Sequence, residues 1–278
     1  MKKFNLTKYK DSSSLLNTTP AKDHYDKVIK EDTSFYLNGE CIGIYVNIAK
    51  ELLSYVRECV KDTDYVETYR THRALPTKSS VFGALPRIAL RNDFCRFSNK
   101  TIEEKENFNK LFTFQKTLCD IYKKHLPELY EYDLKKAKEL VDDDYRLVDT
   151  PYTTANINVN HAIKYHCDSG NIKGSFSNVL ILKEHCTGGE LVLPDYRIAL
   201  EQADGALCIF KGQQEIHGVM PIKPYKEGFY RASIVYYTMA QLQHCYPYKE
   251  EVTRLNLKKR ERAIKRSNNI DPRTNGQK

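Results

Sequence analysis

The 278-residue sequence has no tryptophan, no Cys-x-x-Cys pair and no apolar run that approaches the thickness of a bilayer. The eight scattered cysteines are therefore expected to be reduced, buried thiols of an intracellular protein. The first residues lack the apolar core of a signal peptide, which predicts a soluble protein of the cytoplasm or nucleus, or of the host cytoplasm if viral, without a membrane partner. No internal repeat is visible, and this excludes a solenoid.

A deficit of negative charge leaves a formal net charge of +8, which is compatible with a polyanionic partner. The cations gather in two clusters. The first, between Tyr69 and Arg96, contains Arg70, His72, Arg73, Lys78, Arg87, Arg91 and Arg96. The second contains Arg254, Lys258, Lys259, Arg260, Arg262, Lys265 and Arg266. Phosphate contact is one interpretation of both clusters, and a solvated surface or a disordered tail is the other.

The chain divides by pattern into an arm, one domain and a tail. Residues 1–35 are polar and lack periodicity, so they are expected to form a flexible arm. Residues 36–248 are interpreted as a single domain, with helical support over 36–149 and a β core over 150–248. Apolar spacing predicts helices over Val46–Lys61, from Thr101 to Tyr122, and from Pro127. Residues 249–278 are a basic tail, interpreted as a surface helix with a frayed end.

Short apolar runs with glycine punctuation dominate the β core. Strands are expected at residues 178–182, 190–193 and 206–210, and the alternation from Tyr230 to Thr238 predicts another. This pattern is typical of a sandwich or jelly roll, so the predicted class is α+β, with a jelly-roll core supported by N-terminal helices.

Three residues of this core have the composition of a metal site. His166 and Asp168 are two apart, so on an extended segment both side chains point to one side, and His217 follows 49 residues later. Two imidazoles and one carboxylate on one face are the ligand set of non-haem Fe(II), which leaves positions for a chelating co-substrate and dioxygen. Arg231 and Ser233 share one strand face and suit a carboxylate, since the guanidinium binds it bidentately.

The ordered set of His-x-Asp, a Gly-Gly-Glu-Leu strand, a distal His and Arg-x-Ser closely resembles the double-stranded β-helix core of the 2-oxoglutarate/Fe(II)-dependent dioxygenases. The resemblance covers roughly residues 150 to 240. It implies that His166, Asp168 and His217 are catalytic iron ligands. It also implies that Arg231 and Ser233 hold the distal carboxylate of 2-oxoglutarate, whose keto acid end chelates the iron.

A narrower resemblance lies in four segments: Asn158-Val159-Asn160, Gly189 to Arg197, Phe82 to Arg87, and Arg91 to Arg96. They look like the TET/JBP branch, which hydroxylates the 5-methyl group of a pyrimidine in DNA. The resemblance implies a DNA partner with an extruded base, and oxidation of 5-methylcytosine first and thymine second. Where base-J-type members have an Arg before His-x-Asp, residues 161–165 read His-Ala-Ile-Lys-Tyr, so base identity stays open.

Four residues are candidates for substrate binding. Asn158 and Asn160 carry amides that can pair with a pyrimidine edge, and turn formation is the rival interpretation. Arg87 and Arg91 are candidates for phosphate contact. Two alternatives compete with the DNA-base hydroxylase: the same chemistry on a protein, RNA, nucleotide or small molecule, and a catalytically silent jelly-roll binding module. No member of the triad is missing, which disfavours the silent module.

Overall fold

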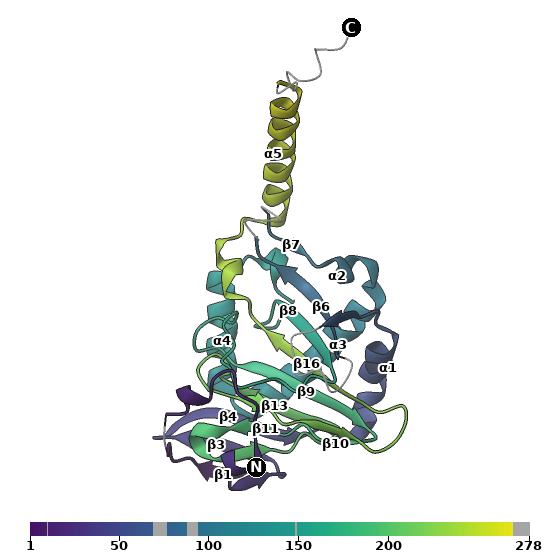
Figure 1. Cartoon of the computed structure of the whole chain (residues 1–278). Coiled ribbons are helices and arrows are strands. Elements are labelled where there is room, and N and C mark those ends of the chain that lie inside the picture. Colours follow the sequence, from purple (N-terminus) through teal and green to yellow (C-terminus); the bar gives the residue numbers. More distant parts are fainter. Residues whose placement is uncertain (10, 69–76, 88–93, 148, 269–278) are drawn as a thin grey trace.

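The computed structural model describes residues 1–9, 11–68, 77–87, 94–147 and 149–268, and its centre is one large sheet (Figure 1). In spatial order the strands of this main sheet are β1 (Lys2–Asn5), β3 (Thr33–Leu37), β4 (Glu40–Asn47), β13 (Ala206–Phe210), β9 (Ser177–Glu184), β16 (Tyr230–Tyr237), β8 (Thr154–Val159), β6 (Thr77–Leu85) and β5 (Val66–Thr68), with β7 (Arg96–Phe97) beside β6. A minor sheet has the order β14 (Gly218–Val219), β11 (Leu191–Leu193), β12 (Ile198–Leu200) and β2 (Lys27–Ile29). The strands β10 (Cys186–Gly188) and β15 (Ile222–Pro224) pair separately.

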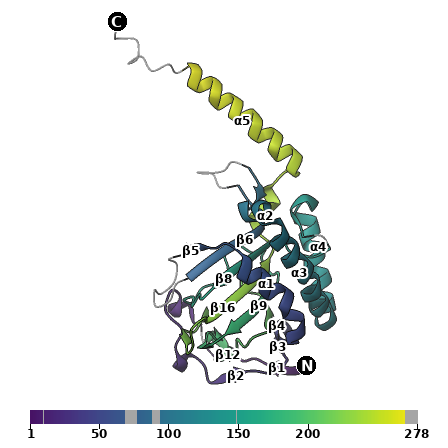
Figure 2. The same cartoon turned by 90° about the vertical axis from the view of Figure 1, so that its right-hand side faces the viewer.

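Helices cover one face of the main sheet and the minor sheet covers the other (Figures 1 and 2). The described helices are α1 (Ser54–Asp62), α2 (Asn99–Glu103), α3 (Lys105–His125), α4 (Pro127–Leu140) and α5 (Tyr248–Asn268), and of these α1, α3 and α4 pack on the sheet face. Short 3-10 turns lie at Ser13–Leu15, Lys22–His24, Lys50–Leu53, Asp143–Tyr145, Pro194–Tyr196 and Ala240–His244. This arrangement confirms the α+β class with a jelly-roll core and helical support.

Strand alternation separates the two cores of the molecule. On β8 and β16, Ile157 and Ile234 pack against α3 in the larger core. The intervening residues of these strands therefore face the minor sheet. There Ile181 of β9 and Phe210 of β13 meet Leu193 of β11 in a second core. Two apolar layers thus hold the β strands in place, and the polar residues between the two sheets mark the candidate site.

The helices begin partly where the sequence predicts. Pro127 is the first residue of α4, as expected, since the ring of proline suits the first helical position. The helix expected from Thr101 is divided into α2 and α3, and the Ser98 hydroxyl accepts a hydrogen bond from the Thr101 N–H at its start. The predicted start of the first helix at Val46 is wrong, because Val46 continues β4 and pairs with Leu207. The support region, residues 36–149, consequently also supplies strands to the main sheet.

The flexible arm expected over residues 1–35 is also corrected, because its described residues are built into both sheets. Strand β1 pairs in parallel with β3, and β2 pairs in parallel with β12. Between them, the Asn17 N–H donates to the Tyr165 carbonyl, and the Tyr165 N–H donates to the Thr18 carbonyl. Backbone pairing needs no periodic pattern of side chains, so polarity alone is misleading here. The arm thereby supports the residue directly before His166.

The expectation of eight reduced cysteines is wrong for two of them. Cys95 and Cys245 form a disulfide that joins the chain after β6 to the segment before α5. The other six, Cys41, Cys59, Cys119, Cys167, Cys186 and Cys208, are free thiols, and all but Cys167 are buried. Among the described residues, no helix combines the length and the apolar character that a membrane crossing requires.

Candidate active site

The three residues expected to bind metal come together between the two sheets. The Nε2 atom of His166 lies 3.5 Å from Oδ1 of Asp168, and Nε2 of His217 lies 3.7 Å from the same oxygen. One ligand atom from each residue lies within 4.8 Å of the other two. Neither His166 nor Asp168 belongs to a regular strand: an isolated antiparallel bridge pairs His166 with His217 through two backbone hydrogen bonds. This bridge holds the two imidazoles side by side.

Each imidazole is oriented by a backbone carbonyl. Nδ1 of His166 lies 2.8 Å from the Lys164 carbonyl, and Nδ1 of His217 lies 2.8 Å from the Glu215 carbonyl. A carbonyl oxygen only accepts, so Nδ1 of each ring carries a proton, and in the neutral form of the ring Nε2 keeps its lone pair. Metal-binding histidines are held in this way, because the outer hydrogen bond sets both tautomer and ring direction. The two Nε2 atoms are therefore prepared as ligands.

The charges of the triad suit a cation. Burial raises the pKa of Asp168, but the hydrogen bond from His166 and the two imidazoles hold it below its usual value. Burial lowers the pKa of His217. Burial acts in the same direction on His166, but the hydrogen bond to Asp168 raises its pKa. A carboxylate beside a buried neutral imidazole is the donor set that divalent iron prefers.

A glycine that the sequence reasoning missed makes room for the carboxylate. A Cβ added to Gly212 would lie 2.3 Å from Oδ2 of Asp168. The Asp168 N–H also donates to the Gly212 carbonyl. The segment from Phe210 to His217 is remote from Asp168 in sequence, so the one local signal for this contact was a glycine two residues after a buried strand.

Arg231 and Ser233 lie where the clamp was expected, on the face of β16 that is turned toward the minor sheet. The Arg231 side chain is one of the largest fully buried ones in the described chain. Its guanidinium donates to the Gly189 carbonyl and to Oε1 of Gln202, and its Nε has no hydrogen-bond partner among the described residues. Burial lowers the pKa of Arg231 to about 10, so it is still a cation at neutral pH.

No described carboxylate forms an ion pair with Arg231. An unpaired buried charge costs several kcal/mol, so the position favours an anion from outside the chain. The neighbouring strand adds a second cation, since Lys183 of β9 is the register partner of Arg231 and donates to the Gly188 carbonyl. The candidate metal centre is therefore accompanied by the buried cation Arg231 and the partly buried Lys183, which suit a dicarboxylate co-substrate.

The family model for the oxygenase domain of the 2OGFeDO superfamily, of the TET/JBP type, matches residues 89–240. This match covers more than half of the chain and contains the triad, Arg231 and Ser233. The chain belongs to this family.

Two curated relatives come from Trypanosoma brucei brucei. Thymine dioxygenase JBP1 is 24% identical over 185 residues, which are 66% of this chain and 22% of that protein. The bifunctional helicase and thymine dioxygenase JBP2 is 27% identical over 120 residues, or 43% of this chain and 11% of that protein. The chain thus spans only about a fifth or less of the length of the curated relatives that it matches.

A solved structure of NgTET1 in complex with 5mC DNA superimposes with a TM-score of 0.56 at 18% identity. The match covers 79% of this chain and 82% of that one. At this level of identity the likeness shows the fold: a TET-like double-stranded β-helix with its helical support.

The expected substrate residues have different surroundings. Asn158 of β8 is buried and pairs in register with Ser233, on the same face as the clamp. The backbone of Asn160 adopts the left-handed conformation, with φ +59°, and its side-chain oxygen accepts a hydrogen bond from the Arg231 N–H. This geometry favours the turn interpretation for Asn160. Arg87 is paired with Glu251, and Arg91 lies outside the described residues.

Proposed function

We propose that this chain is an Fe(II)- and 2-oxoglutarate-dependent dioxygenase that hydroxylates the 5-methyl group of a pyrimidine in DNA. Membership of the TET/JBP family supports the class of chemistry. The relatives support the substrate, because two of them are thymine dioxygenases and one solved structure contains 5mC DNA. Following the sequence prediction, 5-methylcytosine is the first candidate base and thymine the second.

His166, Asp168 and His217 are proposed to hold the iron through two Nε2 atoms and one carboxylate oxygen. The orientation of both Nδ1 atoms toward carbonyls supports this assignment, since it leaves the Nε2 atoms available. When bound, iron and 2-oxoglutarate supply chemistry that uses dioxygen to convert a methyl C–H into C–OH, with release of succinate and carbon dioxide.

The observation that carries the co-substrate proposal is the buried, unpaired guanidinium of Arg231. Its Nε lacks a partner among the described residues, so a carboxylate placed there would gain a charge-assisted hydrogen bond that the chain itself does not provide. Ser233, two residues along the same strand face, is proposed to donate its hydroxyl to that carboxylate. Together they would hold the distal end of 2-oxoglutarate.

The pyrimidine must leave the duplex to reach this site, because a stacked base shields its methyl group from a side-chain pocket. Asn158 is proposed to contact the extruded base, since its amide offers both a donor and an acceptor on the face that carries the clamp. Asn160 and Arg87 are proposed to act indirectly, through the backbone of Arg231 and the position of Glu251, respectively.

Mass spectrometry of nucleosides tests the proposal. The protein is incubated with Fe(II), 2-oxoglutarate and oligonucleotides that carry 5-methylcytosine or only thymine as the methylated base. We expect 5-hydroxymethylcytosine, or hydroxymethyluracil if thymine is the substrate. The His217→Ala and Asp168→Ala variants serve as controls and should give no product. If neither base is oxidised while a peptide or metabolite drives succinate formation, the DNA substrate is refuted and the dioxygenase class is retained.

A further inference from the structure

Helix α5 projects away from the body of the molecule (Figures 1 and 2). Every side chain from Asn256 to Ile264 is exposed. Helices in proteins draw most of their stability from packing an apolar face, and α5 buries such contacts only in its first two turns. A helix that is polar on nearly all sides therefore draws its stability from something other than an apolar face, such as i,i+4 ion pairs like that of Arg254 with Glu250 or a bound partner.

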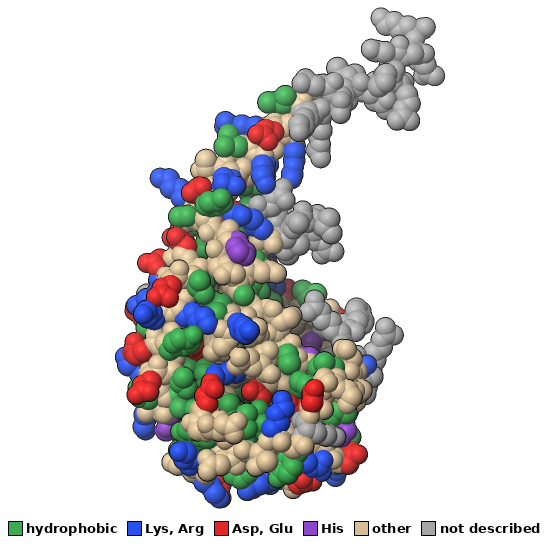
Figure 3. Space-filling model, turned by 90° about the vertical axis from the view of Figure 1, so that its left-hand side faces the viewer, with side chains coloured by type: hydrophobic (Ala, Val, Ile, Leu, Met, Phe, Trp, Pro, Cys, Tyr) green, Lys and Arg blue, Asp and Glu red, His purple; other side chains and the backbone are tan. Residues whose placement is uncertain are grey.

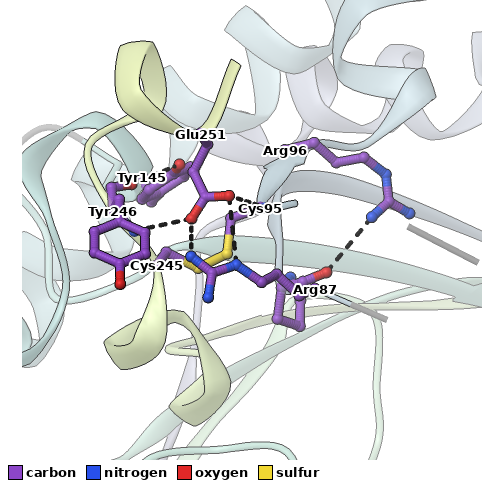
Figure 4. Close-up of a disulfide and its surroundings, with 8 residues drawn as sticks. Arg87, Cys95, Arg96, Tyr145, Cys245, Tyr246 and Glu251 are labelled. Atoms are coloured by element: carbon purple, nitrogen blue, oxygen red, sulfur yellow. Dashed lines mark hydrogen bonds and ion pairs between the residues drawn. A yellow bond between two sulfur atoms is a disulfide. The ribbon is translucent and has the colours of Figure 1, made fainter. Parts of the chain in front are cut away.

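The root of α5 is firmly attached to the domain (Figure 4). The disulfide of Cys245 with Cys95 lies just before the helix. In the first turn the carboxylate of Glu251, which is 1% exposed, pairs with Arg87 and accepts hydrogen bonds from the backbone N–H groups of Cys95 and Tyr246. The disulfide before the helix and the fully paired, buried carboxylate in its first turn together fix the direction in which α5 leaves the body.

Beyond its root α5 carries mainly positive charge (Figure 3). Arg254, Lys258 and Arg262 are four residues apart, so they lie on one face, and Lys259 borders that face. The large exposed apolar side chains of the described part of α5 are Leu257 and Ile264, which share one flank of the helix, and a further cation, Arg260, lies opposite the row. Two apolar residues on two turns are too few for a packed protein interface, whereas a row of cations matches the regularly spaced phosphates of a nucleic acid.

We propose that α5 is a basic arm that contacts the phosphate backbone of the duplex flanking the target base. This inference rests on the proposed function, because it takes DNA as the substrate. Beyond its first two turns, residues 256–268 of α5 span about 20 Å at 1.5 Å per residue, which corresponds to about six base pairs of duplex. The arm would add affinity that is independent of the base in the pocket.

The test compares two triple variants that remove the same charge. In the first, Lys258→Gln, Lys259→Gln and Arg262→Gln neutralise the arm; glutamine keeps helix propensity similar to that of lysine and arginine. In the matched control, Lys105→Gln, Lys124→Gln and Lys138→Gln neutralise exposed lysines on α3 and α4, on the far side of the main sheet from the candidate site. Fluorescence anisotropy measures the affinity for a duplex of about 30 base pairs at several salt concentrations.

We expect the plot of log affinity against log salt to become flatter by up to about 2.7 for the arm variant, since each released phosphate contact contributes about 0.9 to the slope. The control variant should keep the slope of the wild type. Equal slopes for the two variants would overturn the proposal that α5 contacts phosphates. A wild-type protein whose duplex binding does not depend on salt would overturn it as well. A change of oligomeric state on sedimentation, with DNA binding unaltered, would also overturn it by assigning α5 to a second copy of the chain.

The two proposals fail in different ways. Product formation from single-stranded oligonucleotides depends on the active site and not on α5. If a base is oxidised but the arm and control variants have equal slopes of log affinity against log salt, only the proposed role of α5 is refuted. If the arm variant shows a flatter plot of log affinity against log salt but no base is oxidised, α5 is supported as a duplex contact and the proposed hydroxylase is refuted.

Discussion

Replacement of Gly189 by alanine should disturb co-substrate binding through Arg231. A Cβ at this position would lie 2.9 Å from Nε and 3.0 Å from Cδ of Arg231, so the guanidinium must move. The φ of +77° adds backbone strain, which for an L-residue costs about 1–2 kcal/mol. Loss of a charge-assisted hydrogen bond is worth about 1.5–3 kcal/mol, which predicts 2-oxoglutarate binding that is weaker by about 10- to 100-fold. Iron binding should be retained.

Gly228→Ala is the matched control. Gly228 has φ +74°, but its added Cβ meets no described heavy atom within 4 Å. Both variants should therefore lose a similar free energy of unfolding from strain, while only Gly189→Ala should raise the KM for 2-oxoglutarate. In an Arg231→Ala background, Gly189→Ala should cause no further loss of co-substrate affinity, because the side chain through which it acts is gone. Equal co-substrate affinity of the two glycine variants in the wild-type background would refute the reasoning.

Three further predictions concern iron, pH and the disulfide. Gly212→Ala should bind less iron than Gly170→Ala, because its Cβ lies 2.3 Å from the ligating carboxylate whereas that of Gly170 meets no described atom within 4 Å; equal iron contents would contradict this. Burial raises the pKa of Asp133 from 3.8 to about 6. The folded state therefore holds this proton more tightly, and the free energy of unfolding should fall as pH rises from 4 to 6, by at most about 3 kcal/mol relative to Asp133→Asn. Urea titrations at several pH values measure this difference, and parallel pH profiles of the two proteins would disprove it. Reduction of the Cys95–Cys245 bond should lower the free energy of unfolding by about 2–4 kcal/mol, and the double serine variant should not respond to the reductant.

Local patterns were enough to predict much of the β core. The strand expected at residues 206–210 is β13, and the alternation from Tyr230 accounts for β16. Such runs are informative because burial on a pleated sheet imposes a period of two, or a continuous apolar run, on the sequence itself. The triad residues could likewise be proposed from their types, order and spacing, and the structure brings them together.

Contacts between distant segments could not be predicted in this way. Nothing periodic marks residues 1–35, yet their backbone groups complete two sheets and support Tyr165. The pairing of Arg87 with Glu251 spans 164 residues, so no local pattern could show that this cation anchors a helix. The sequence by itself determined several strands of the β core, the helix from Pro127 and the chemistry of the ligands, because these depend on local pattern and residue identity. Only the tertiary structure decided which backbone edges, glycines and buried charges meet, because those contacts join residues whose separation along the chain carries no signal.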